Sequence, residues 1–397
     1  MFYFFVYVLI VLSFSLILKL KVYHPVVITH LIWFVVILLY NLIPSKLYPL
    51  SSNVYLKLIL YLFFFLFGSI FYYIVFGIKK QNYFNLQGIE NTTNLLFDFV
   101  FFLTSYLFLR YFMMFANGTT LYKEIVQGRL PLDIRILSYF DKLSLVYFFY
   151  IITIKKTLLK KEKIFIVLFF ITYFLKFSKM DIMQLFTGIL LSLWIKKKIK
   201  IRHILLLVLL MFSLLSFIHL WRKGNTDSLT KAIGEMMAIY FLSPITAFDM
   251  IVNNKIHFNK YQTFVFLERF FSRIFQINIF ASNKQIFDGW VFVPYPTNVY
   301  TTMWRFYSDF REAGLIVFGQ FLGFFWTYIY SKRYKTIYNL IYTALFYILI
   351  FQFFSDILFG YFSAVLQIIL ICVIVIKLKQ SKMIKHDISL TLSYRTD

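Results

Sequence analysis

Arginine residues gather in one long polar stretch, residues 222–311, of an otherwise strongly apolar sequence. The guanidinium group is planar and permanently charged, and its fork of N–H donors matches the oxygens of a phosphate or diphosphate. The alternative for any single arginine is an anchor whose side chain reaches to the lipid headgroups. As a set, we interpret them as diphosphate ligands. The candidates are Arg222, Arg269, Arg273, Arg305 and Arg311, and a smaller polar stretch, residues 117–139, adds Arg129 and Arg135.

Two carboxylates, Asp309 and Glu312, stand three residues apart where an apolar run begins. One of them is a candidate general base that would take a proton from a sugar hydroxyl, or a hydrogen-bond partner for the sugar. The same spacing also fits a capping box, with Asp309 as N-cap and Glu312 at the third helical position. Both interpretations stay open at this point.

His219, beside Trp221 and Arg222, and His257 in the middle of the polar stretch are further candidate bases, because imidazole exchanges protons near neutral pH. A lone histidine is more often a structural hydrogen-bonding residue. The six histidines have no ligand spacing and Cys372 is the only cysteine, so no metal site is predicted. The sequence also lacks a P-loop and a dinucleotide fingerprint in a suitable context, and we expect no cofactor.

Composition identifies the solvent of most of the chain as lipid. Hydrophobic residues make up 61% of the 397 residues, and aromatic residues 22%. The net charge of +24 would suggest nucleic acid in a soluble protein. Here the lysines cluster at the ends of apolar runs, so we interpret the charge as a determinant of topology and of contact with anionic membrane lipids, and we expect no nucleic acid partner.

About eleven apolar runs are long enough to cross a hydrocarbon core of roughly 30 Å. They lie near residues 2–20, 25–43, 54–77, 95–116, 140–154, 163–178, 180–195, 203–221, 313–330, 336–354 and 356–376. We predict an all-α polytopic membrane protein with a single membrane domain over residues 1–397. Its parts are spans 1–8 in residues 1–221, the long loop 222–311, spans 9–11 in residues 312–378, and a tail at 379–397.

The connecting charges predict the orientation. If the N-terminus is outside, about half of the 41 basic residues fall in the short loops and the tail on the inner side of the membrane. The short loops on the outer side contain few basic residues. Positive charge marks the cytoplasmic side. We therefore expect an uncleaved first span, a cytoplasmic C-terminus and an external long loop, which is periplasmic in a bacterium.

The long loop itself carries apolar pieces. Residues 232–252 are apolar and interrupted at Pro244, and we expect them to lie in the interface or to enter the bilayer part-way. Residues 263–276 predict an amphipathic helix lying flat on the membrane, with Arg269 and Arg273 one turn apart. Inside the predicted spans 95–116 and 356–376, Asp98, Arg110 and Asp356 are costly in lipid, so each needs a partner from elsewhere.

Four stretches of the chain resemble the Wzy-type O-antigen polymerases of bacterial inner membranes. They are HPVVITHLIWFVVILLYNL at 24–42, WRKGN at 221–225, YFLSPITAFDMIV at 240–252 and NVYTTMWRFYSDFREAG at 298–314. The resemblance covers most of the chain as a hydropathy pattern and these short stretches as residues. The Arg-x10-Gly pattern of the family does not fit Arg222 or Arg305 and is not transferred.

The resemblance implies a GT-C-like glycosyltransferase of lipopolysaccharide O-antigen biosynthesis. Such an enzyme joins oligosaccharide repeat units carried on undecaprenyl diphosphate, as donor and acceptor, at the periplasmic face. It needs cations for the departing diphosphate and a base for the acceptor hydroxyl. Asn298, Tyr300 and Tyr307 become the candidate sugar-binding residues, and Asp309, His219 and Glu312 the candidate catalytic ones. The family also implies a chain-length-determining co-polymerase as a partner.

Two rival functions share the membrane-bundle plan. An O-antigen ligase would use the same lipid-linked donor with a different acceptor, and sequence separates the two poorly. A repeat-unit flippase is a transporter, and we would expect a central cationic cavity in its spans rather than a charged external loop.

Overall fold

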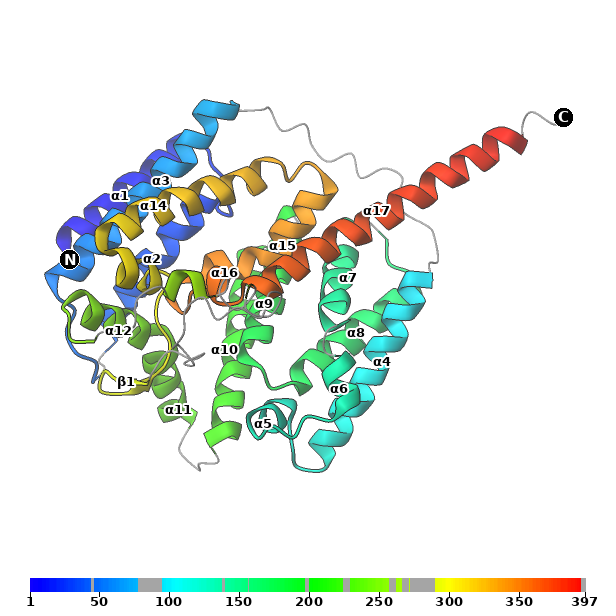
Figure 1. Cartoon of the computed structure of the whole chain (residues 1–397), viewed down its shortest axis with the longest axis horizontal. Helices are drawn as coiled ribbons and strands as arrows, with labels where there is room; N and C mark the ends of the chain where they lie inside the picture. Colours follow the sequence, from blue (N-terminus) through cyan, green and yellow to red (C-terminus); the bar gives the residue numbers. More distant parts are fainter. Residues whose placement is uncertain are drawn as a thin grey trace. The chain divides into compact units, whose positions relative to one another are not determined.

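The structure, a computed structural model, is built almost entirely from α-helices (Figure 1). It describes residues 1–43, 46–77, 95–137, 140–155, 157–196, 200–223, 229–256, 262–265, 271 and 290–393. The helices fall into two compact units, and each unit is assembled from several segments of the chain. The first unit combines residues 1–80, 225–331 and 348–365, and the second combines 81–224, 332–347 and 366–397.

Within the described residues, seven helices are long and apolar enough to cross a membrane. They are Pro25–Leu42, Ser52–Phe76, Leu95–Ala116, Arg202–Leu220, Ile233–Val252, Trp304–Ser331 and Thr336–Phe353. Helices occupy the other apolar runs as well, and their apolar parts are shorter, as in α1 (Phe2–Ile17), α8 (Lys160–Leu175) and residues Phe362–Leu378. The chain is therefore an all-α polytopic membrane protein, as predicted. The count of eleven spans stays a prediction.

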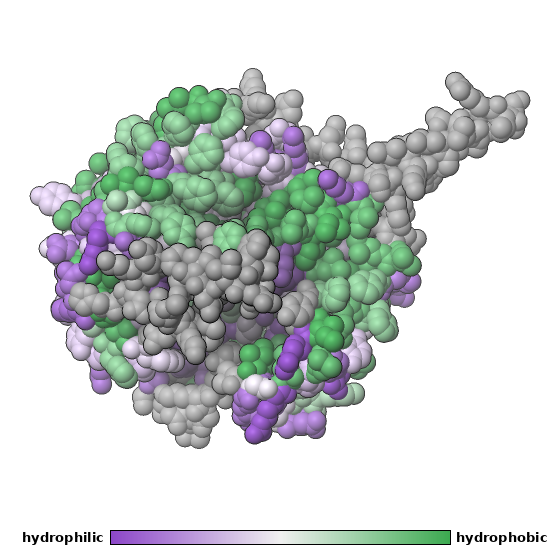
Figure 2. Space-filling view, in the orientation of Figure 1, coloured by the Kyte–Doolittle hydropathy of each residue, from purple (hydrophilic) through white to green (hydrophobic). Residues whose placement is uncertain are grey.

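Apolar side chains cover much of the visible surface of the described helices (Figure 2). On α1 and α10 (Ile201–Lys223), for example, Phe2, Leu206 and Leu209 are each more than half exposed. Such surfaces are stable against lipid chains and not against water. Their exposure supports the membrane assignment independently of helix length.

The first unit is organised around two long helices, α3 (Ser52–Phe76) and α14 (Trp304–Ser331). Their backbones come so close that a Cβ on Gly68 or Gly323 would collide with the opposite main chain, at the carbonyls of Gln320 and Phe65 respectively. The hydroxyls of Ser69 and Thr327 form a hydrogen bond across the same interface. Small residues thus allow the close helix packing that the spacing of Gly319 and Gly323 indicates.

The other elements of the first unit pack around this pair. They are α1, α2 (Pro25–Leu42), α11 (Leu229–Met236), η2 (Met237–Leu242), α12 (Ser243–Val252), η3 (Gln262–Phe264), β1 (Val291–Phe292), β2 (Pro296–Thr297), η4 (Phe351–Phe353) and α16 (Ile357–Gly360). The two short strands form one antiparallel hairpin that pairs Val291 with Thr297. Its neighbour in the unit is the segment before α3, because the N–H of Tyr48 donates to the carbonyl of Val293 at 3.4 Å.

The interruption expected at Pro244 does not occur. Helical conformation continues from α11 through the π-helical turn η2 into α12, where Pro244 occupies one of the first two positions. A proline has no N–H to donate to the preceding turn, and a wider turn is a known way to accommodate that loss inside a helix. The apolar segment 233–252 is therefore one continuous helical stretch, most of it buried.

Helix α14 contains a sharp kink at Arg311, whose φ of 53° and ψ of −135° are not helical. The kink brings the following turn back against the preceding one, so that a Cβ on Gly314 would collide with the carbonyl oxygen of Phe306. A positive φ at a residue other than glycine costs about 1–3 kcal/mol. The short helix before the kink carries three of the residues that the sequence marked for chemistry, Arg305, Tyr307 and Asp309.

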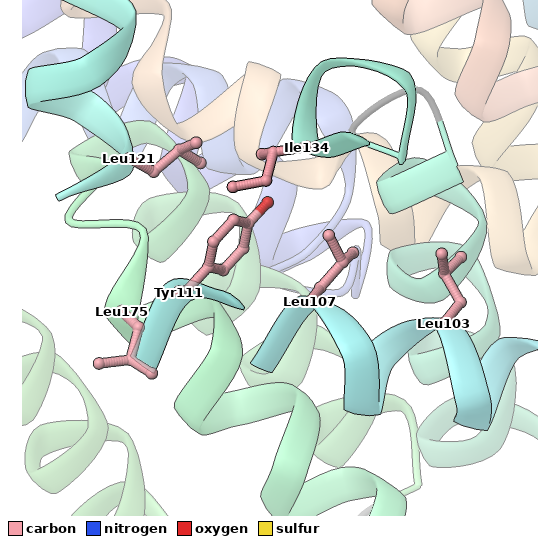
Figure 3. Packing of buried hydrophobic residues seen from close by; sticks show 6 residues of the cluster. All are labelled: Leu103, Leu107, Tyr111, Leu121, Ile134 and Leu175. Carbon is pink, nitrogen blue, oxygen red and sulfur yellow. The ribbon is translucent and has the colours of Figure 1, made fainter. Parts of the chain in front are cut away.

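The second unit contains α4 (Leu95–Ala116), α5 (Leu121–Val126), α6 (Leu132–Leu137), α7 (Asp141–Ile154), α8, α9 (Lys179–Ile195), α10, and most of α15 (Thr336–Ile350) and α17 (Phe362–Ser393). Leu121 and Ile134 from the two short helices pack with Leu107 and Tyr111 of α4 in one apolar cluster (Figure 3). This cluster fixes the smaller polar stretch against the membrane helices.

Two basic residues of the second unit, Arg110 and Lys176, have acidic partners, as the cost of charge in lipid requires. Arg110 of α4 binds Asp133 of α6 with an Nε–Oδ2 distance of 2.8 Å, and the hydroxyl of Tyr106 donates to the same carboxylate. Buried Lys176 pairs with Asp141. The predicted need of Arg110 for a distant partner is confirmed, whereas Asp98 is exposed on α4.

Candidate functional site

Arg305, in the first turn of α14, lies at the centre of a polar cluster in the first unit. Its Nε is 3.1 Å from Oδ2 of Asp356, its NH1 donates to the carbonyl of Gln262 at 3.0 Å, and its guanidinium stacks 4.8 Å from the Trp304 ring. Asp356 in turn caps α16 by accepting from the N–H of Phe359. Arg305 is thus rigidly held, with a side chain that is 14% exposed.

Asp309 faces the same short segment that Arg305 binds. Its Oδ1 accepts from the N–H of Gln262 at 3.0 Å, and its Oδ2 from the N–H of Thr263 at 2.6 Å. The predicted capping box of Asp309 with Glu312 is therefore wrong, because the kinked α14 begins at Trp304 and both carboxylates bind elsewhere. Arg305 and Asp309, one helical turn apart, both bind η3. Arg305 donates to its carbonyl oxygen, and Asp309 accepts from its N–H groups. We call Arg305, Asp309, Asp356 and Gln262 the Arg305 centre.

Glu312 lies just beyond the kink and forms an ion pair with Lys57 of α3. The side chain of Glu312 is 48% exposed, and that of Lys57 is 21% exposed. Among the carboxylates predicted for catalysis in this unit, Glu312 is the accessible one, because both oxygens of Asp309 already accept backbone N–H groups.

Tyr307 links these groups to the rest of the unit. The guanidinium carbon of Arg311 lies 5.5 Å from the centre of its ring, and Nζ of Lys57 lies 6.0 Å from it. On another side the ring meets Phe248 of α12 edge to face, with centroids 5.8 Å apart. Tyr307 is nearly buried, so its ring positions two cations beside the Arg305 centre.

The other predicted sugar ligands lie before α14. Tyr300 is buried and its ring packs on Trp304 at 5.2 Å, so it supports the residue that stacks on Arg305. Asn298 is half-buried after strand β2. Of the three, Tyr307 has cations next to its ring, Lys57 and Arg311.

The remaining site candidates are in the second unit or outside the described residues. His219 is on α10 in the second unit, where its Nδ1 lies 3.4 Å from Nζ of Lys179 and both side chains are buried. The backbone of Arg222 belongs to the same helix, and its side chain is not described. Arg269, Arg273 and His257 lie outside the described residues, as does most of the predicted amphipathic helix 263–276.

Three partners in the cluster were not predicted as site residues: Lys57, Gln262 and Asp356. Asp356 carried a signal, since an acid inside an apolar run indicates a buried partner. Lys57 carried the same signal, as a lysine within the run 54–77. Gln262 contributes main-chain atoms, so its side-chain type could not reveal its role.

The smaller polar stretch has its own electrostatic arrangement. Burial alone would raise the pKa of Asp133, but hydrogen bonds from Tyr106 and Arg110 outweigh it and lower the pKa below its ordinary value of 3.8. Arg135, the arginine of α6, donates to the carbonyl of Leu130 at 3.5 Å. The charged side chain of Asp133 therefore holds α6 against α4.

Within the described part of the chain, no group of three or more His, Cys, Asp or Glu side chains is placed to hold a metal ion. No protein-family model matches the chain, and searches among curated proteins and among solved structures found no significantly similar protein.

Proposed function

We propose that the protein is a membrane glycosyltransferase that joins oligosaccharide repeat units carried on undecaprenyl diphosphate, that is, an O-antigen polymerase. The observation that carries the proposal is the geometry of α14. Arg305 and Asp309, one turn apart, are fixed on the same turn, Gln262–Thr263, while Arg311 and Glu312 follow directly at the kink. A membrane protein that holds cations and carboxylates together in this way has the two chemical groups that glycosyl transfer from a diphosphate requires.

In the proposed reaction, the bond between the anomeric carbon of the donor sugar and the diphosphate oxygen breaks, and the diphosphate leaves with the electron pair. The acceptor hydroxyl oxygen forms the new bond to that carbon and releases its proton to a carboxylate. Arg311 and Arg305 would stabilise the departing diphosphate, and Arg222, Arg269 and Arg273 remain further candidates. Preorganised guanidinium groups are effective here because they need no rearrangement as charge develops.

Glu312 is the best candidate for the proton acceptor. It is the more accessible carboxylate, and Lys57 next to it can stabilise its charged form. Asp309 then acts as a positioning residue, because it fixes the turn that Arg305 also binds. His219 remains an alternative base in the second unit.

The location follows from the charge distribution of the loops. We infer a bacterial inner-membrane protein with the long loop in the periplasm and the C-terminus in the cytoplasm. Alkaline phosphatase and green fluorescent protein fused after Lys255 and after Lys377 test this orientation. Phosphatase activity after Lys255 and fluorescence after Lys377 are expected, and the reverse pattern would contradict the proposed site of reaction.

The functional test is deletion of the gene in its native host. Loss of a polymerase leaves lipopolysaccharide with a single repeat unit, whereas loss of a ligase or flippase leaves none. Complementation with Glu312→Gln should give the single-repeat product with normal protein levels, since an exposed ion pair contributes only about 0–1 kcal/mol to stability. Normal chain lengths with Glu312→Gln would remove Glu312 from the proposed role.

A further inference from the structure

A buried carboxylate of the first unit, Asp249, is not among the residues of the Arg305 centre. Asp249, in the last turn of α12, is buried to 7% exposure. Its Oδ1 accepts hydrogen bonds from Nδ2 of Asn253 at 3.0 Å and from the hydroxyl of Ser51, and its Oδ2 accepts from the N–H of Ser51 at 3.3 Å. All of these donors are neutral.

The charge of Asp249 distinguishes it from the acids around it. Asp356 pairs with Arg305 and Glu312 pairs with Lys57, but in the part of the chain that the structure describes no cation lies within ion-pair distance of Asp249. A buried carboxylate without a cation is costly in a membrane protein, and it usually marks a functional site. The neutral donors hold this carboxylate in one orientation.

Asp249 also has unused capacity to accept hydrogen bonds. A carboxylate offers about four acceptor positions. Oδ1 receives two donors, whereas Oδ2 receives only the long bond from Ser51. Further polar groups extend from it toward the surface, since Nδ2 of exposed Asn53 donates to Oδ1 of Asn253 at 3.4 Å. Oδ2 is therefore the oxygen that would accept a hydrogen bond from a hydroxyl group of a ligand.

Aromatic residues lie on segments that are hydrogen-bonded to this part of α12. The hydroxyl of Tyr40 accepts a hydrogen bond from Thr246, which lies about one helical turn before Asp249 on α12. The same hydroxyl donates to the carbonyl of Tyr48. Tyr48 is 48% exposed, and its main chain is bonded to the hairpin that presents exposed Phe292. The segments that carry these rings are thus hydrogen-bonded to the part of α12 that carries Asp249. Aromatic rings together with a carboxylate and amides are the groups that bind the apolar and polar sides of a sugar ring.

We propose that Asp249, Ser51, Asn253 and Asn53, which we call the Asp249 site, bind the hydroxyl groups of a neutral sugar. A carboxylate repels phosphate, so the site suits the carbohydrate part of a lipid-linked substrate and not its diphosphate. The inference rests on the proposed function, for which it assigns an acceptor-sugar site. Phe248, the neighbour of Asp249, contacts Tyr307, so the Asp249 site and the Arg305 centre belong to adjoining parts of one unit.

Binding of two separate probes to the purified protein in lipid nanodiscs tests the inference. One probe is the free oligosaccharide repeat released from the surface polysaccharide of the native host, and the other is undecaprenyl diphosphate. Asp249→Asn should weaken oligosaccharide binding at least about tenfold, because it removes a charged hydrogen-bond acceptor. The affinity for undecaprenyl diphosphate should stay unchanged.

Asn53→Ala is the second variant, because Asn53 is exposed and its loss leaves the bonds of Asp249 to Ser51 intact. It should weaken oligosaccharide binding several-fold, and it decides the matter if Asp249→Asn does not fold. Asp98→Asn on α4 is the matched control and should bind both probes as the wild type does.

The outcomes separate the two proposals. Oligosaccharide binding that is unaffected by both Asp249→Asn and Asn53→Ala, or a wild type that binds only undecaprenyl diphosphate, overturns the Asp249 site and leaves the proposed function standing. A wild type that binds neither probe overturns the proposed function and the Asp249 site with it. Selective loss of oligosaccharide binding in the variants supports the inference.

Discussion

Nε of Arg305 lies 3.1 Å from Oδ2 of Asp356, a carboxylate that is only 1% exposed. The pair joins the first turn of α14 to the N-cap of α16, and the same guanidinium binds the turn η3. A side chain in this position has a structural role whatever its role in substrate binding. Loss of activity in a simple alanine variant of Arg305 would therefore not identify a catalytic function.

A double-mutant cycle measures the structural role of the pair. Arg305→Met leaves Asp356 buried without its cation and should destabilise the protein by about 3–5 kcal/mol. Asp356→Asn in the same chain removes that charge, so the double variant should recover much of the loss. Thermal unfolding in detergent measures each term. Equal destabilisation of the single and double variants would show that the pair contributes nothing beyond its packing.

The α3–α14 interface gives a second prediction, because Gly323 packs directly on the main chain of Phe65. Gly323→Ala forces the two helices apart and should destabilise the first unit by about 1–3 kcal/mol.

Gly234→Ala is the matched control for this substitution. Gly234 is an exposed residue of α11, and an added Cβ would meet nothing within 4 Å. Alanine is the better helix former there, by about 0.5–1 kcal/mol, so the control should stabilise the helix slightly. The two substitutions should thus shift the unfolding temperature in opposite directions, and a common direction would contradict the packing argument.

The helices could be predicted from the sequence, because lipid leaves a chain few ways to satisfy its backbone, and long apolar runs become helices. The partners of the charged residues could not be predicted from the sequence. That Asp356 and Arg110 need partners follows from their position, but Arg305 and Asp133 come from distant parts of the chain. For the same reason the spacing of Asp309 and Glu312 did not predict the role of Asp309. The sequence suggested a helix cap, whereas the carboxylate accepts from the N–H groups of Gln262 and Thr263.

The second unit gives a prediction for pH. The pKa of Asp133 is lowered in the folded protein, so the charged form stabilises the contact of α6 with α4 above its ordinary pKa of 3.8. That contribution is fully present at neutral pH and is lost as the pH falls through the lowered pKa. For a pair that is one-third exposed it amounts to about 0.5–1 kcal/mol.

Unfolding temperatures of the wild type and of Asp133→Asn, measured over a pH series, check this point. The difference between them should be constant near neutral pH and should shrink below about pH 4. A difference that grows on acidification would reverse the sign and exclude the ion pair as its origin.

Arg311 offers the sharpest test of function, because its backbone conformation and its guanidinium can be changed separately. Its φ of 53° and ψ of −135° are accessible to glycine without strain. Arg311→Gly should therefore keep the kink and leave the stability unchanged or about 1 kcal/mol higher, since relief of strain is offset by the greater freedom of the unfolded chain. The guanidinium beside Tyr307 is lost in the same step.

If Arg311 stabilises the departing diphosphate, glycan polymerisation by Arg311→Gly should fall by a factor of about 10²–10³, the usual effect of removing one electrostatic group from a transition state. Arg311→Lys is the matched variant, because it keeps the positive charge and the strained backbone and should retain part of the activity. Chain lengths in cells and unfolding temperatures of the purified variants give the two readouts. Full activity of a stable Arg311→Gly protein would exclude Arg311 from the diphosphate site, whereas lost activity with lost stability would show that its side chain maintains the kink.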